Sequence, residues 1–584
     1  MSQERFYTAE RNVQILISVL KANNIRRVIA SPGTTNYTLV GSLQDDPYFE
    51  IYSSVDERSA AYLACGMTAE SGEPVVITCT GATASRNYLS GLTEAYYRKL
   101  PVLAVTSHQG TDRIGQLMPQ NIDRRSIPND VALISVELPV VKDERDAAYV
   151  TMQANKAVLE LKHNGGGPVH INIFTTYSRD FSVKELPEVR IMRRYMAWDR
   201  LPEIPEGRIA VYVGSHARFT EDLTECLDRF CATHDAVVIC DHTSGYYGRY
   251  RLQPTLAELQ EYAVSPMPVL DIMVHIGEMS AATFAGRFKA KKIWRVSEDG
   301  ELRDPFHGLS AVFQMQEQMF FRHYGEDGHD RHEFIDECRR AYGDIYGSIP
   351  ELPFSNMWAA QQLSSRLPEN SSIHIGVSNT RRCWNIFPLP EGVESSCNVG
   401  CCGIDGCVSS LIGASLVHPE RLFFGVFGDL TFFYDMNVLG NRHVGRNVRI
   451  MLINNGRGAE FRLKTHFCYT FKEDADRYMA AAGHYGNQSP DLIRHYAQDL
   501  GCQYMAANNK EEFIKALETF TDSEIGEKPM LLEVFTQPED EMEALEMMSH
   551  IQSDPKVVVR KKIINSAKSI LGENTIRTIK SKIM

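Results

Sequence analysis

Short apolar runs alternate along this chain with longer segments whose apolar positions recur at helical spacing. Strands that alternate with helices in this way are typical of a parallel, doubly wound sheet. Ligands bind at the carboxyl ends of the strands in such sheets, so the loops that follow the runs are where we expect the chemistry. In the N-terminal part the runs occupy 26–33, 49–57, 73–81, 100–107 and 167–174.

Two polar, Pro-containing stretches, 181–206 and 347–356, interrupt this alternation and are typical of linkers. They predict three α/β domains, at 1–182, 205–345 and 352–545, followed by a tail at 555–584. The expected strands are 208–214, 236–241, 270–277 and 291–297 in the central domain, and 371–378, 421–429, 448–455 and 528–535 in the third.

Composition narrows the class of protein. Hydrophobic residues make up 43% of the chain and charged residues 23%, as in ordinary globular enzymes. The net charge of −13 argues against a general nucleic-acid binder, which needs a basic surface. We expect no transmembrane segment, because no apolar run reaches the ~18 residues required. The first residues lack the apolar stretch of a signal peptide and no cysteine pair has CxxC spacing, so we expect a reduced, cytoplasmic enzyme.

The tail has a different composition from the rest of the chain. From residue 556 onward it carries eight Lys or Arg residues against one acid, Glu573, with apolar residues at helical spacing. Such a pattern predicts a basic amphipathic helix. It could pack on the acidic body of the protein, or it could anchor the chain to a membrane surface or a partner.

Two apolar runs of the third domain end in oxygen-bearing side chains. Asp429 follows "RLFFGVFG", and Asn455 closes "VRIMLINN" one helical crossover later. Parallel strands end at the same edge of a sheet, so this carboxylate and this amide can meet on one hard cation such as Mg²⁺. Gly428 would let the backbone approach a phosphate, and Thr431 lies where a helix N-terminus would present N–H groups to it.

This stretch resembles the diphosphate-binding motif of thiamine-diphosphate-dependent enzymes. The resemblance implies that Asp429, Asn455 and the carbonyl of Arg457 bind Mg²⁺, and that Leu430 occupies the third position of the Gly-Asp-x triplet. It also implies three domains: pyrimidine-binding, central and diphosphate-binding. A βαβ unit with capping polar residues is the alternative without a ligand.

Glu57 opens a predicted helix directly after the strand in "FEIYSSVDE". An acid there is ordinarily a partner of the helix dipole. In the family that the chain resembles, a Glu at this place hydrogen-bonds the aminopyrimidine N1′ and so activates the thiazolium C2. The family also forms its site between subunits, which implies a homodimer or homotetramer.

Within the family the chain is most similar to the menaquinone-pathway branch, which decarboxylates 2-oxoglutarate and adds the product to isochorismate. The segments "SPGTTNYTL", "VDERSAAYLACG", "GQLMPQNID", "NVGCCGIDG" and "GDLTFFYDMN" carry this resemblance. Ile404 matches the aliphatic residue that holds the cofactor bent, although it could equally be an ordinary core residue. The resemblance assigns Ser378 to the diphosphate, Gln120 to catalysis and substrate, and Arg382 and Phe461 to substrate.

The chain departs from this branch at three arginine positions. The branch has Ser-Arg where Thr34 and Thr35 stand here, an Arg at Gln109, and an Arg at Val399. A buried charge-assisted contact is worth about 1.5–3 kcal/mol, so these exchanges predict a weaker grip on polycarboxylates. Arg382 could still hold one carboxylate, or simply pair with an acid such as Asp405. Further polar residues in nearby loops, each as plausibly solvated as functional, are His108, Arg113, Arg457, Glu460 and Arg462.

The residues and the resemblance together therefore predict a thiamine-diphosphate and Mg²⁺-dependent transferase that decarboxylates a 2-oxo acid and joins the product to an acceptor, such as a carbonyl or enone. Because of the three exchanged arginines, we expect its substrates to differ from the menaquinone-pathway pair. Three alternatives stay open at this point. They are the menaquinone-pathway synthase itself with 2-oxoglutarate and isochorismate, a simple 2-oxo-acid decarboxylase, and a non-catalytic scaffold that retains the fold.

Overall fold

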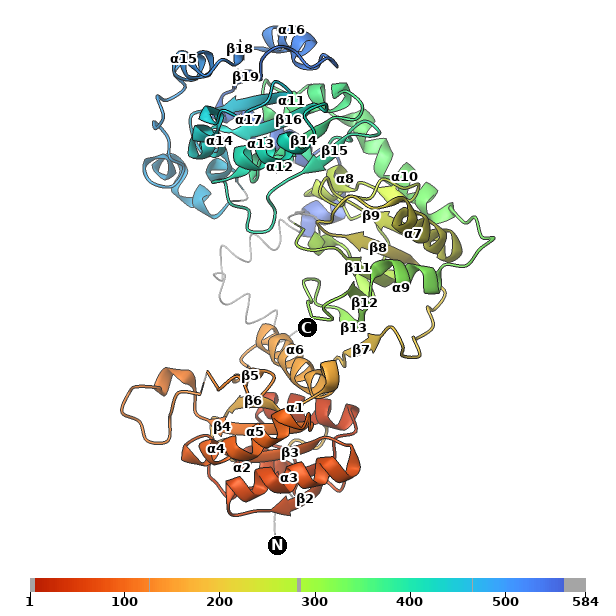
Figure 1. The fold of residues 1–584 in the computed structure, drawn as a ribbon, viewed down its shortest axis with the longest axis vertical. Coiled ribbons are helices and arrows are strands. Elements are labelled where there is room, and N and C mark those ends of the chain that lie inside the picture. Colours follow the sequence, from red (N-terminus) through yellow and green to blue (C-terminus); the bar gives the residue numbers. More distant parts are fainter. Residues whose placement is uncertain (1–5, 125, 281–284, 465, 561–584) are drawn as a thin grey trace. The chain divides into compact units, whose positions relative to one another are not determined.

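We describe residues 6–124, 126–280, 285–464 and 466–560 of a computed structural model of the chain (Figure 1). The first sheet has the strand order β2-β1-β3-β4-β6-β5, and all its strand pairs are parallel. The order reverses between β1 and β3, so the switch point of this sheet lies there. Its strands are β1 (Arg27–Ala30), β2 (Glu50–Ser53), β3 (Val75–Thr80), β4 (Val102–His108), β5 (Ser135–Leu138) and β6 (Val169–Phe174).

Helices cover both faces of the first sheet, as a doubly wound fold requires (Figure 1). Helices α1 (Arg11–Ala22) and α6 (Glu144–Glu160) pack on each other and share one core cluster with the strands. Helices α3 (Glu57–Ser71) and α5 (Leu89–Tyr97) contribute to a second cluster with the same strands. Two short helices, α2 (Tyr37–Leu43) and α4 (Thr83–Asn87), follow β1 and β3.

The second sheet has the order β10-β9-β8-β11-β12-β13-β7. Its strands are β7 (Arg193–Met196), β8 (Ile209–Val213), β9 (Val237–Ile239), β10 (Arg251–Leu252), β11 (Leu270–Ile276), β12 (Ala290–Ser297) and β13 (Leu309–Gln314). The accompanying helices are α7 (Glu221–His234), α8 (Thr255–Leu259), α9 (Glu317–Tyr324) and α10 (Glu333–Gly343).

The third sheet, β15-β14-β16-β17-β19-β18, is again parallel throughout and reverses its order between β14 and β16. Its strands are β14 (Ser372–Ile375), β15 (Glu394–Ser396), β16 (Phe423–Gly428), β17 (Val448–Asn454), β18 (Gln503–Ala507) and β19 (Met530–Phe535). The helices are α11 (Asn356–Leu363), α12 (Asn379–Trp384), α13 (Cys407–Val417), α14 (Asp429–Asp435), α15 (Leu492–Asp499), α16 (Lys510–Phe520) and α17 (Pro538–Ser549).

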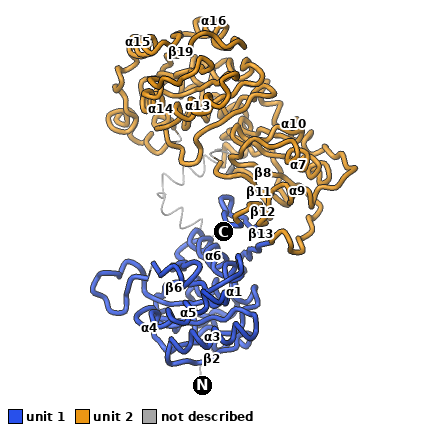
Figure 2. The backbone as a smooth tube through the Cα atoms, viewed as in Figure 1, with its two compact units in different colours: residues 1–195, 300–312, 568–584 blue, residues 196–299, 313–567 orange. Residues whose placement is uncertain are grey.

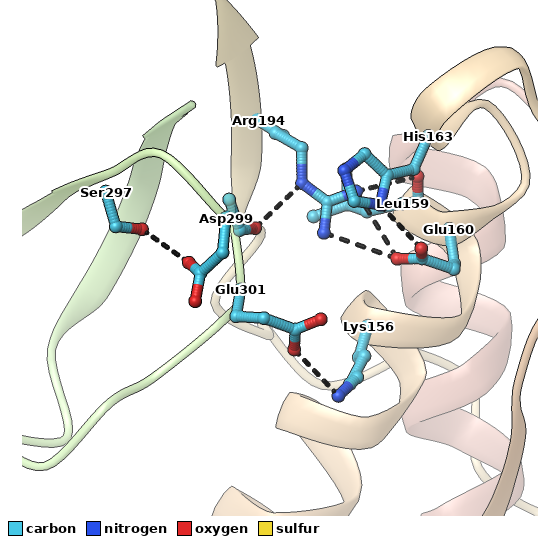
Figure 3. Close-up of polar contacts among 9 residues, drawn as sticks. Lys156, Leu159, Glu160, His163, Arg194, Ser297, Asp299 and Glu301 are labelled. Atoms are coloured by element: carbon cyan, nitrogen blue, oxygen red, sulfur yellow. Dashed lines mark hydrogen bonds and ion pairs between the residues drawn. The ribbon is translucent and has the colours of Figure 1, made fainter. Parts of the chain in front are cut away.

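The chain divides into two compact units (Figure 2). Of the described residues, unit 1 contains those from 6 to 195 together with 300–312, and unit 2 contains those in 196–299 and 313–560. The returning segment 300–312 is bound to unit 1 by Lys156, whose ammonium lies 3.0 Å from the Glu301 carboxylate, and by Arg194, which donates to the Gly300 carbonyl (Figure 3). Arg194 also pairs with Glu160 at 3.3 Å.

The α/β class predicted from the sequence is confirmed, with three sheets of parallel strands. Each predicted run forms a strand, whereas the strands β5, β7, β10, β13, β15 and β18 were not predicted. Most of them are short or lie at a sheet edge, where an amphipathic run has a weak pattern. The domain limits stay predictions, and most of the predicted tail falls outside the described residues. In the part of the chain that we describe, no helix is long and apolar enough to cross a membrane.

Candidate active site

A cavity of about 370 Å³ opens at the carboxyl edge of the third sheet, where its strand order reverses. This is the place at which open α/β sheets bind ligands. Most of the walls come from the segments that follow β14, β16 and β17, with Ile404 contributed by the segment between β15 and α13. They include the predicted residues Ser378, Ile404, Gly428, Asp429, Leu430, Thr431, Asn455, Arg457 and Phe461, together with Glu460 and His466.

Asp429 and Asn455 lie side by side on this edge because β16 and β17 pair with Gly428 opposite Ile453. Both side chains are buried, with 4% and 6% of their surface exposed. Burial raises the pKa of Asp429 to about 7, while backbone N–H groups of Leu430 and residues 455–457 act in the opposite direction. No described residue forms an ion pair with this carboxylate. A buried carboxylate that lacks a cation fits a site for Mg²⁺.

The proposed third metal ligand is the backbone carbonyl of Arg457, and the side chain of this residue is engaged elsewhere. Its guanidinium pairs with Asp476 at 2.5 Å, and Arg462 pairs with the same carboxylate at 3.1 Å. Among the described residues no cluster of three His, Cys, Asp or Glu side chains could hold a metal. A ligand set of one carboxylate, one amide and one carbonyl would not form such a cluster.

The residues predicted to contact a diphosphate lie at the starts of α14 and α12. Gly428 has ordinary backbone angles, and an added Cβ would meet only the Thr380 hydroxyl, at 3.7 Å. The protein itself therefore does not require glycine at this position, whose open side borders the cavity. Ser378 has φ 60° and ψ −126° directly before α12. Strained backbone of this kind at a non-glycine residue is concentrated at functional sites.

Arg382 and Glu460 form an ion pair of 2.8 Å at this end of the cavity. Burial raises the pKa of Glu460, but Arg382 outweighs it and holds this pKa below its usual range. Arg382 therefore does pair with an acid, and that acid is Glu460 instead of Asp405. Glu460 also borders the cavity. From its position in a predicted loop it could equally have been exposed to solvent.

His466 was not expected from the sequence. It borders the cavity, and its ring lies edge-on to Phe461 with 5.1 Å between centroids. No local pattern in the sequence marks this histidine. Ile404 is half-buried; it packs against the core cluster of the third sheet and also borders the cavity, so both of its expected roles stay open.

Glu57 is the first residue of α3 in unit 1. Asp56 caps this helix, because its carboxylate accepts the backbone N–H groups of Arg58 and Ser59. Glu57 is therefore not needed as the cap. Its half-buried carboxylate accepts a hydrogen bond of 3.0 Å from the Asn87 amide, a partner that sequence reasoning missed.

The predicted substrate residues of unit 1 have unequal exposure. Thr34 and Gln120 are exposed, and Gln120 has φ 65°. Thr35 is buried and donates to the Ser107 carbonyl at 2.7 Å. Gln109 donates to the Tyr177 hydroxyl and accepts a hydrogen bond from Arg113, so a guanidinium does lie beside this position.

The chain is similar to known proteins over nearly its whole length. Residues 11–127 match the family described as thiamine pyrophosphate enzyme, N-terminal TPP binding domain. A 2-succinyl-5-enolpyruvyl-6-hydroxy-3-cyclohexene-1-carboxylate synthase of Bacteroides thetaiotaomicron is 29% identical over 576 residues, which cover 93% of this chain and 99% of that protein. Proteins of the same name from Porphyromonas gingivalis and Flavobacterium johnsoniae are 26% and 24% identical, over 91% and 90% of this chain and 95% of each relative.

The chain is similar to the thiamine-diphosphate-dependent enzymes, through the domain matched over residues 11–127 and through relatives of 24–29% identity. Within them it is similar to the menaquinone-pathway synthases, over nearly the whole length of the relatives named above. Thiamine diphosphate is the cofactor of this family, and Mg²⁺ is its usual partner.

Proposed function

We propose that this enzyme decarboxylates a 2-oxo acid and joins the remaining fragment to an acceptor, with 2-oxoglutarate and isochorismate as its first candidate substrates. The observation that carries the proposal is the cavity of the third sheet, where Asp429 and Asn455 meet beside Ser378 and the Arg382–Glu460 pair. The relatives' shared name favours this substrate pair over an unrelated one.

In this proposal Asp429, Asn455 and the carbonyl of Arg457 hold Mg²⁺ and, through it, the diphosphate. Ser378 and the backbone around Gly428, Leu430 and Thr431 complete the diphosphate contacts. The bound cofactor supplies an electron sink for the decarboxylation. Ile404 would support the bent conformation of the cofactor, because it packs against the core cluster and also borders the cavity.

Glu57 is proposed to hold a proton at the aminopyrimidine N1′, and Asn87 to fix the orientation of the Glu57 carboxylate through the 3.0 Å hydrogen bond. The family resemblance supports a homodimer or homotetramer in which Glu57 serves the cofactor held by another subunit. Light scattering of the purified protein tests this part of the proposal. A monomer that retains full activity would contradict it.

Substrate carboxylates need guanidinium partners, and the chain offers two near the expected positions. Arg113 binds Gln109, the residue that stands at one of the arginine positions of the branch. Arg382 forms an ion pair with Glu460, which borders the cofactor cavity. Two guanidinium groups could bind the two carboxylates of 2-oxoglutarate. The exchange of three arginines in the sequence had argued against such a substrate. Thr34, Gln120 and Phe461 are proposed as further substrate contacts.

A second candidate substrate is a 2-oxo acid with fewer carboxylates. The Thr35 hydroxyl donates its hydrogen bond to the Ser107 carbonyl, and Val399 is buried. Both side chains are neutral, so two of the three exchanged positions offer no charge to a ligand. A simple decarboxylase would use the same cavity without an acceptor. A non-catalytic scaffold is not favoured by the uncompensated Asp429 carboxylate.

One experiment separates these candidates. Purified protein with thiamine diphosphate and Mg²⁺ is given 2-oxoglutarate with and without isochorismate, and other 2-oxo acids in parallel, with CO₂ release and product mass recorded. We expect the adduct of the first pair. CO₂ release from another acid alone would favour the second candidate. Absence of a calorimetric binding signal for thiamine diphosphate and Mg²⁺ would favour the scaffold.

A further inference from the structure

Arg124 is a buried cation without a counter-charge. Only 3% of its surface is exposed, and its Nε, Nη1 and Nη2 atoms donate no hydrogen bond to any described residue. A guanidinium carries five N–H donors, and burying it without partners is among the most costly arrangements in a protein. Burial lowers the pKa of Arg124 to about 10, so the group is still charged at neutral pH.

Arg124 lies at the carboxyl edge of the first sheet, next to the end of β3. A Cβ at Gly81 would come within 2.4 Å of its Nη2 atom, so the missing side chain of Gly81 leaves the space for the guanidinium. Glu137 is the carboxylate whose field acts on Arg124, but the two form no ion pair in the described part of the chain. Its Oε1 atom also lacks a hydrogen-bond partner there.

A small cavity of about 20 Å³ adjoins Arg124. This is room for about one water-sized group. Arg86, whose guanidinium donates to the Asp123 carbonyl at 2.8 Å, lines the same cavity, and none of the lining residues is acidic. The other lining residues are Ser85, Tyr88, Leu89, Leu92, Ala104, Thr106, Ile127, Val131 and His170.

The polar neighbours do not supply the missing negative charge. His170 bonds through its two ring nitrogens to the hydroxyls of Thr106 and Ser135, and burial lowers its pKa to about 3, so it is neutral. Ser85 donates to the Ala82 carbonyl at 2.7 Å. The guanidinium N–H groups of Arg124 are thus the donors that remain for a ligand.

We propose that this cavity is a binding site for one small monovalent inorganic anion of halide size, held between Arg124 and Arg86. A spherical anion accepts N–H groups from any direction and fits the volume, whereas a carboxylate of three heavy atoms does not. All residues that line the site belong to unit 1, whereas those that line the cofactor cavity belong to unit 2.

The site has a consequence for Glu57, which rests on the proposed function. Arg86 and Ser85 belong to α4, and the last residue of that helix is Asn87, the hydrogen-bond donor to Glu57. An anion that neutralises the two guanidinium groups therefore fixes the helix that orients this carboxylate.

The test uses bromide as the probe, because it scatters anomalously. Crystals of the full chain grown in NaBr should show one anomalous peak within hydrogen-bond distance of the Arg124 guanidinium. In solution, the thermal unfolding midpoint should be about 2–4 °C higher in NaCl than in sodium gluconate of equal ionic strength. Arg124→Met should lose this difference, whereas the control Arg98→Met, at the exposed end of α5, should retain it.

A cavity that contains only water, or a carboxylate in place of bromide, would overturn the proposal. So would equal unfolding midpoints in the two salts. If Arg124→Met does not fold, the bromide peak in the unaltered protein decides alone. Failure of the proposed catalytic function would leave both of these readouts unchanged, so the two proposals are tested separately.

Discussion

Arg382 donates a hydrogen bond of 2.8 Å to Glu460, and this pair forms part of the boundary between two cavities. Glu460 borders the 370 Å³ cavity of the third sheet, the proposed cofactor site, whereas Arg382 borders a second cavity of about 930 Å³ with Arg462 and Lys464. The carboxylate of the pair therefore belongs to the first cavity, and its guanidinium cation belongs to the second. A substrate carboxylate that reaches Arg382 must compete with Glu460 for it.

Breaking this pair tests its role. Arg382→Met should remove the cation that lowers the pKa of Glu460 against the effect of burial, so this pKa should rise. It should lower the free energy of unfolding by about 1–2 kcal/mol, because a partly buried charge-assisted hydrogen bond is lost. We expect a larger rise in KM for the 2-oxo acid than fall in kcat. An unchanged KM would exclude Arg382 as a substrate contact, and Arg494→Met, on the exposed α15, is the control.

Asp429→Asn should separate stability from cofactor binding. The pKa of Asp429 in the folded, metal-free chain is raised to about 7, above its ordinary value of 3.8. Its contribution to stability is therefore complete below about pH 4 and is lost as the pH rises through 7. We expect the variant to be more stable than the unaltered apoprotein at pH 8, by about 1–4 kcal/mol, and equally stable at pH 4.

The same variant should bind thiamine diphosphate and Mg²⁺ at least tenfold more weakly in calorimetry, since the metal loses its only carboxylate ligand. Burial also raises the pKa of Glu541 to about 7, so this residue titrates in the same pH range as Asp429. The stability of the variant apoprotein is therefore compared with that of the unaltered apoprotein at each pH, which removes the contribution of Glu541. Unweakened cofactor binding would remove Asp429 from the metal site.

Glu57→Ala should abolish turnover without unfolding α3, because Asp56 caps that helix. We expect CO₂ release to fall more than a hundredfold, with the calorimetric Kd for the cofactor changed only a few-fold. Asn87→Ala should give a smaller loss, of roughly five- to fiftyfold, since it removes only the orienting hydrogen bond. Glu70→Ala, on the same helix and exposed, should have no effect. Full activity of Glu57→Ala would end its assignment.

Ser378→Gly should stabilise the apoprotein. Glycine adopts positive φ without steric cost, so removal of the strain at this position should add about 1 kcal/mol to the free energy of unfolding. The variant should also bind the cofactor more weakly, because the hydroxyl is lost. Ser378→Ala should show the weaker binding without the gain in stability. Identical unfolding midpoints for the two variants would show that this backbone conformation carries no strain.

The sequence predicted the site best where a polar side chain directly follows a strand. The runs that became β16 and β17 predicted that Asp429 and Asn455 would meet, because parallel strands share an edge. The family resemblance added Ser378, Ile404 and Phe461, and the structure brings all of them to one cavity. Asp429 and Asn455 follow their strands directly, so their positions depend on sheet geometry, whereas Ile404 and Phe461 lie several residues beyond a strand and were found through the resemblance.

Other residues could not be placed from the sequence because long-range contacts decide them. His466 lies in an irregular segment and borders the cavity only through the path of the chain after β17. Asn87 reaches Glu57 from a different helix, thirty positions away. The partner of Arg382 was uncertain for the same reason: both Asp405 and Glu460 were available in loops, and only the folded chain selects between them.

Asp56 caps α3, whereas Glu57 is free to serve the cofactor, and this separation of roles has a practical value. Since the architecture of α3 depends on the first of these acids, the second can be exchanged for an inert side chain in protein that is still correctly assembled. Such a variant would be a stalled enzyme, suited to capturing unreacted substrates in crystals and to identifying them from cell extracts by mass spectrometry.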